Sequence, residues 1–229
     1  MNWIKKPALS FTEKIILLLV GAILAVGYYL FYTNVPRFEV FVEEDGFVEW
    51  LTVLGLLMGC VVCVSRFISL RKKRNWWFLT VVLGLGILLF FAAGEEISWG
   101  QRILGIQSSE FFKENNAQGE TNLHNLIVDG VKLNKLIFSI GLSIALGIYL
   151  LLFPILYQQN EKIKKWIDHS GIPVAQLYQV IAIAVLFILV ELIHHGKNAE
   201  ILEAGIALLF FLIIKYPRNS SIFQKNYLG

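Results

Sequence analysis

Six long apolar runs decide what this chain can fold into. The hydrocarbon core of a bilayer is about 30 Å thick, and a helix needs roughly 20 mostly apolar residues to cross it. The runs are Ile15–Thr33, Phe47–Leu70, Trp76–Ala93, Leu136–Tyr157, Val174–Ile193 and Asn198–Tyr216. They predict an all-α protein, a polytopic transmembrane helix bundle of six spans that forms a single integral membrane domain over residues 1–229.

The composition excludes the main soluble classes. Of the 229 residues, 56% are hydrophobic and 16% are charged, whereas soluble domains average about 45–50% and about 25%. These values exclude a soluble enzyme, a disordered tail and a basic domain that binds nucleic acid. The two cysteines, Cys60 and Cys63, are too few for a disulfide framework. Membrane lipids are therefore the expected partners.

The distribution of Lys and Arg predicts the orientation. One set of connections, together with both chain ends, carries 14 of the 20 basic residues and a net charge of +11. The opposite face carries a net charge of −8, and the two faces together give the net charge of +3. Because Lys and Arg accumulate on the cytoplasmic side, both termini are expected to be cytoplasmic, in a bacterial inner membrane. The long loop Ser98–Lys135 between spans three and four is then extracytoplasmic.

Four polar clusters fall on this predicted outer face. They are Glu43–Trp50, Gly94–Arg102, Gln118–Asn125 and Glu191–Asn198, the last followed by Glu200 and Glu203 at the start of span six. Ionisable groups at the edge of a bilayer are costly unless they face a cavity or each other. We therefore expect one shared site at the outer helix ends, with the trio Glu43–Asp45 as a solvated loop beside it.

Helical spacing suggests how the clusters converge. If the third span continues as a helix past Gly94, Glu95 and Arg102 are seven residues apart and share a face. Glu191 precedes His194 by three residues and His195 by four, so that a carboxylate and imidazoles point into one cavity.

These residue types fit a metal centre. Catalytic zinc takes three protein ligands from His and carboxylates and leaves one position for water. We expect His124, Glu191, His194 and His195 as metal ligands and Glu96 as a further ligand or general base. Zinc is the first expectation. Iron is the alternative, because Glu191-Leu-Ile-His194 has the spacing of a di-iron ligand pair.

Two motifs carry a resemblance to a known family. The segments Gly94-Glu-Glu-Ile-Ser-Trp-Gly-Gln-Arg102 and Gln118-Gly-Glu-Thr-Asn-Leu-His-Asn125 resemble those of an uncharacterised family of bacterial multi-pass membrane proteins. The segment Glu44–Trp50 is similar as well, and the likeness covers roughly the first 130 residues. It implies one functional unit and brings no activity with it.

Together these patterns lead to a first functional hypothesis. We expect an integral membrane enzyme with an extracytoplasmic site, a metal-dependent hydrolase or transferase that acts on a lipid or lipid-linked substrate. Glu95, Glu96 and Arg102 are its expected catalytic residues, with Arg102 holding an anionic headgroup. The alternative is a non-catalytic complex subunit or transporter that uses the outer acidic and histidine clusters for docking or ion binding.

Overall fold

The chain is almost entirely helical. The computed structural model describes residues 8–123, 125–128, 131–132 and 141–226. Its helices are α1 (Phe11–Thr33), α2 (Val35–Phe41), α3 (Phe47–Leu70), α4 (Trp76–Glu96), η1 (Ser98–Gly100), α5 (Gln101–Leu104), α6 (Glu110–Asn115), α7 (Leu142–Gly147), η3 (Ile148–Leu152), α8 (Phe153–Gln159), α9 (Glu161–Ser170), α10 (Leu177–Glu191), α11 (Ala199–Lys215) and η4 (Ser220–Phe223). Two short strands, β1 (Ile127–Val128) and β2 (Val131–Lys132), pair antiparallel in the loop that follows α6.

Four helical stretches are long and apolar enough to cross a membrane. They are α1, α3, α4 and the continuous stretch Leu142–Gln159, which comprises α7, η3 and α8. The outer surfaces of the first three expose large apolar side chains such as Leu18, Val61 and Leu88. A surface of this kind is stable against lipid rather than water. The prediction of a transmembrane helical protein is therefore confirmed.

The six-span count stays a prediction. The first three expected spans match α1, α3 and α4, but part of the fourth, residues 136–140, lies outside the described residues. The last two, α10 and α11, have 15 and 17 residues. At 1.5 Å per residue they are about 23 and 26 Å long, which is less than the thickness of a typical bilayer core.

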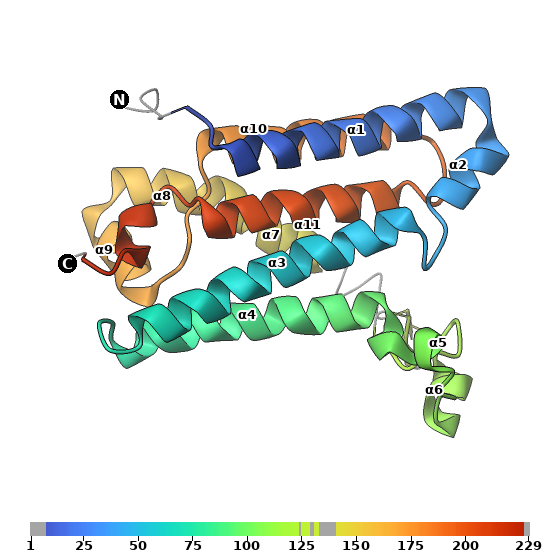
Figure 1. Ribbon diagram of the computed structural model, residues 1–229, viewed down its shortest axis with the longest axis horizontal. Coiled ribbons are helices and arrows are strands. Elements are labelled where there is room, and N and C mark those ends of the chain that lie inside the picture. The colour runs from blue at the N-terminus through green and yellow to red at the C-terminus, as the bar shows by residue number, and fades with distance from the viewer. Residues whose placement is uncertain (1–7, 124, 129–130, 133–140, 227–229) are drawn as a thin grey trace.

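Helix α11 forms the centre of the bundle. It packs against α3, α10 and α1 (Figure 1). Most of its side chains from Ile201 to Ile214 are buried. The contact with α3 is close because Gly55 lies against the backbone of α11, where an added Cβ would be 2.8 Å from the Ala207 carbonyl carbon. Small residues of this kind allow transmembrane helices to approach each other.

The two ends of the bundle differ in what they carry. Helices α5 and α6 lie at one end, close to where α4 stops, and α9 lies at the other end (Figure 1). Helix α1 begins, and the last described residues lie, at the α9 end (Figure 1). Three lysines, Lys162, Lys164 and Lys165, belong to α9. The glutamates that follow α2 and end α4 belong to the opposite end, and these glutamates form the candidate site.

Candidate functional site

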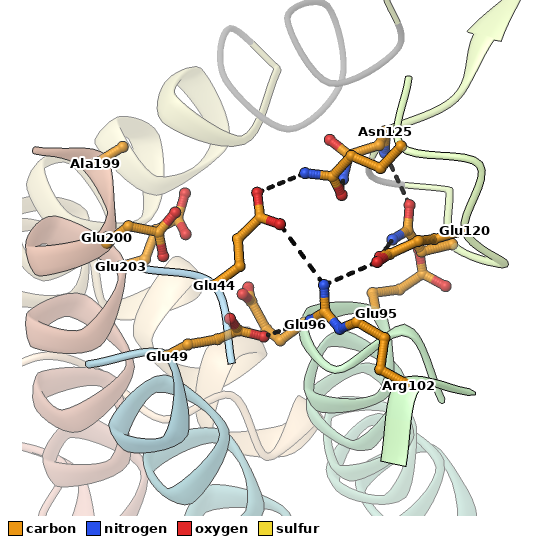
Figure 2. A pocket seen from close by; sticks show the side chains of 12 residues that line it. Glu44, Glu49, Glu95, Glu96, Arg102, Glu120, Asn125, Ala199, Glu200 and Glu203 are labelled. Atoms are coloured by element: carbon orange, nitrogen blue, oxygen red, sulfur yellow. Dashed lines mark hydrogen bonds and ion pairs between the residues drawn. The ribbon is translucent and has the colours of Figure 1, made fainter. Parts of the chain in front are cut away.

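A cavity of about 290 Å³ lies where four separate segments meet. These segments are the α2–α3 connection with the first turn of α3, the end of α4, the loop from α5 to β1, and the start of α11. Figure 2 shows their side chains around the cavity. The lining residues are Glu44, Glu49, Glu95, Glu96, Arg102, Gln118, Glu120, Asn122, Asn125, Ala199, Glu200 and Glu203. The expected catalytic residues Glu95, Glu96 and Arg102 are therefore brought together.

Arg102 is surrounded by carboxylates on one side of the cavity. Its Nε lies 2.7 Å from Asp45 Oδ2, and its Nη2 lies 3.2 Å from Glu49 Oε1. Its Nη1 lies 2.9 Å from Glu120 Oε1 and 3.7 Å from Glu44 Oε2. Partial burial works to lower the pKa of Arg102, but Glu120, Asp45 and Glu49 outweigh it, so the pKa is raised and the guanidinium stays charged.

A left-handed turn brings Arg102 to this position. Helix α4 stops at Glu96, and Ser98, Trp99 and Gly100 then have φ values of 46°, 56° and 74°. The expectation that Glu95 and Arg102 share one continuous helical face is therefore wrong. Two consecutive non-glycine residues in this region are energetically unfavourable and are found where the surroundings impose them, often at functional sites.

The side chains of the turn fix the loop that closes the cavity. The indole Nε1 of Trp99 donates to Glu95 Oε1 at 2.8 Å, and the backbone N–H of Leu123 donates to the other oxygen of Glu95. Ser98 Oγ donates to Glu120 Oε2 and accepts from Asn122 Nδ2 at 2.8 Å. Glu95 is buried, and its role is to hold the Gln118–Asn125 segment on the end of α4.

The same segment is tied to the first polar cluster. The amide of Gln118 donates to Glu44 Oε1 and accepts from Asn125 Nδ2. Glu44 and Asp45 both lie within 4 Å of Arg102. The expectation that residues 43–45 form only a solvated loop is therefore wrong for these two. The first, second and third clusters form one hydrogen-bonded unit.

The opposite side of the cavity is acidic, and Lys197 acts on it only through a longer-range attraction to Glu200. Glu96, Glu200 and Glu203 are partly buried, and within the described ranges none of the three has a hydrogen-bond or ion-pair partner. They lie near enough to repel one another electrostatically. Figure 2 shows Glu200 and Glu203 projecting from α11, across the cavity from Arg102.

Three of the four expected metal ligands lie elsewhere. Glu191 and His194 are exposed, and neither lines the cavity. Helix α10 ends at Glu191, so the helical spacing expected between Glu191 and the two histidines does not apply. His195 packs edge-on against Phe38, with ring centroids 5.0 Å apart, and its Nε2 lies 3.4 Å from Glu39 Oε1.

His124 lies outside the described residues. Among the residues that are described, no three His, Cys, Asp or Glu side chains are grouped closely enough to hold a metal ion. The fourth cluster thus reaches the cavity only through Glu200 and Glu203.

Glu49, Glu120, Glu200 and Glu203 belong to the clusters that were expected to share a site, but they were not among the expected catalytic residues or metal ligands. A signal was present for three of them, because a glutamate in the first turn of an apolar helix, or just beside it, is costly without a partner. Comparison with models of known protein families, with curated proteins and with solved structures found no match. Function is therefore inferred from the chemistry of the cavity.

Proposed function

We propose that this protein is a six-span bacterial inner-membrane protein, with both termini in the cytoplasm and the acidic cavity on the extracytoplasmic face. The Lys and Arg distribution supports this orientation, because the basic connections and both chain ends fall on one face of the predicted topology. The cavity belongs to the end of the bundle that carries the acidic excess. Membership of the bacterial family suggested by the two motifs stays a prediction.

We further propose that the cavity is the active site of a hydrolase or transferase that acts on a lipid or lipid-linked molecule. The observation that carries this is the presence of two kinds of carboxylate in one cavity. Glu49 and Glu120 form ion pairs with Arg102, whereas Glu96 and Glu203 form none among the described residues. A carboxylate that has no cation beside it is available to accept a proton, which is the task of a general base.

The roles follow from these surroundings. Glu96, as a carboxylate at the end of α4, accepts the proton of the attacking water or acceptor hydroxyl. The protonated Glu96 then donates that proton to the leaving oxygen, so that one residue serves as base and then as acid. Arg102 is a positioning residue in this scheme, because its charge is already shared among four carboxylates and is not available to hold an anionic headgroup.

A lipid turnover assay tests the proposed activity. The purified full chain is reconstituted in vesicles made from a total bacterial lipid extract, and the lipids are followed by mass spectrometry. Wild type is expected to convert one lipid class, and Glu96→Gln to slow that conversion by roughly 100-fold or more. Glu114→Gln, an exposed change in α6, is the matched control. Unchanged lipids with wild type, or equal rates for Glu96→Gln, would contradict the proposal.

A metal-dependent form of this activity also stays a prediction. It requires His124 to join Glu191, His194 and His195, with zinc or iron as the ion. Elemental analysis of the purified protein and of a His124→Ala variant tests it directly, because loss of bound metal in the variant is the expected result.

The non-catalytic alternative has one observation in its favour. The unpartnered carboxylates Glu96, Glu200 and Glu203 suit an ion-binding or docking site in a transporter or complex subunit as well as they suit an enzyme. The lipid assay separates the two, because the alternative predicts binding without any chemical change in the lipid.

A further inference from the structure

We infer that the ligand of the cavity carries an ammonium group. This inference rests on the proposal that the cavity is a working site, and it names the chemical class of what binds there.

The lining is strongly acidic. Among the described residues that line it, seven are glutamates and Arg102 is the one basic residue. Four carboxylates already lie within 4 Å of Arg102, from Glu44, Asp45, Glu49 and Glu120. An anionic ligand would therefore meet no available cation along the described lining, and it would face several carboxylates. A ligand with a positive charge would be attracted by these carboxylates.

One side of the cavity carries carboxylates that could bind a positively charged group. The Glu203 carboxylate is deeply enclosed, lines the cavity and has no protein partner among the described residues. Glu96 and Glu200 face the same space and form no ion pair among the described residues, although Lys197 attracts Glu200 electrostatically from outside the lining. Enclosing carboxylates without a counter-charge is costly, and an ammonium group that donates to them offsets that cost.

The size of the site favours an organic cation over a metal ion. Calcium and similar ions need several oxygen ligands at about 2.3–2.6 Å, and no three acidic or histidine side chains in the described segments are grouped in that way. The cavity of about 290 Å³ is near the lower limit of small-molecule sites, which is roughly 300 Å³. It suits a headgroup-sized amine, with the amides of Gln118 and Asn125 at its edge for hydrogen bonds.

The ammonium group can belong to an aminophospholipid headgroup or to a free small amine, and two experimental arms separate these sources. In the first arm, ethanolamine is titrated calorimetrically into the full chain in nanodiscs of phosphatidylglycerol, and N-acetylethanolamine is the uncharged control. In the second arm, native mass spectrometry measures how much phosphatidylethanolamine the protein retains from nanodiscs with equal parts of both lipids.

Binding of ethanolamine or phosphatidylethanolamine is expected in at least one arm, and binding of N-acetylethanolamine is expected to be absent. Glu203→Gln and, separately, Glu200→Gln should each weaken binding by roughly tenfold or more, because each removes a charged acceptor. Glu114→Gln should bind like wild type. The Glu200 variant keeps the test decisive if Glu203→Gln does not fold.

Three results would overturn the inference: equal binding of the acetylated compound, no binding in either arm, or unchanged binding in both glutamate variants. Displacement of the amine by calcium at equal concentration would also overturn it. Failure of the proposed activity gives a different result. Amine binding without lipid turnover would contradict the enzyme proposal and support this inference. Turnover of a lipid that has no ammonium group would support the enzyme proposal and contradict this inference.

Discussion

Arg102 links the segments that form the end of the molecule where the cavity lies. The Glu49 side chain is only 5% exposed, and its Oε1 lies 3.2 Å from the guanidinium of Arg102. The other contact to this carboxylate is a hydrogen bond from the backbone N–H of Asp45. Removing the arginine would leave a buried carboxylate without its counter-charge, which costs far more than losing an exposed ion pair.

We therefore expect Arg102→Ala to lower the free energy of unfolding by roughly 1–3 kcal/mol. Thermal unfolding in detergent, followed by tryptophan fluorescence, measures this. The double variant Arg102→Ala with Glu49→Gln should lose less than the sum of the single changes, because the two residues are coupled. Arg71→Ala, an exposed change at the other end of the bundle, is the control. Strict additivity of the two changes would contradict the role given to Arg102.

At this scale the sequence supports some site residues and not others. Glu95, Glu96 and Arg102 could be predicted because charges beside an apolar run need a shared cavity. The turn that positions Arg102 could not be predicted. It depends on Ser98 and Trp99 adopting the left-handed backbone conformation, which these residue types do not favour.

At the scale of elements, the length of its apolar run describes α11 poorly. Its 17 residues are short for a membrane span, and Glu200 and Glu203 lie near its start. Both features follow from its position, because a helix enclosed by α1, α3 and α10 faces little lipid and its first turn lines the cavity. Burial by neighbouring helices cannot be deduced from the length of an apolar run.

The packing of α11 on α3 gives a prediction at this scale. Gly55→Ala places a methyl group 2.8 Å from the Ala207 carbonyl carbon and must separate the two helices. We expect a loss of stability of roughly 1–3 kcal/mol. Gly84→Ala is the matched control, because nothing lies within 4 Å of its added Cβ, and alanine in a helix is stabilising by about 0.5–1 kcal/mol over glycine. Equal unfolding temperatures for the two variants would contradict the close α3–α11 contact.

For the whole molecule, the separation of charge is the feature that joins fold and function. In the predicted topology, the net charge of +3 combines a basic face of +11 and an acidic face of −8. The basic excess predicts the orientation, and much of the acidic excess is collected in the cavity. The transmembrane helical class was predictable from the apolar runs. The charge pattern did not predict the position of the histidines. His194 and His195 fall on the same predicted face as the cavity residues, but neither lines the cavity.

The most direct test of this account is a cysteine cross-link across the cavity, made from outside the cell. The amide of Gln118 donates to Glu44 Oε1 although the two residues are 74 positions apart. In a chain with Cys60 and Cys63 replaced by Ala, the pair Glu44→Cys and Gln118→Cys should be joined in intact cells by a short, membrane-impermeant bis-maleimide. The pair Glu44→Cys and Lys164→Cys, from opposite ends of the bundle, should not be joined. Efficient joining of the first pair alone is the predicted result. Failure of the first pair to react in intact cells would contradict an extracytoplasmic cavity formed by converging segments.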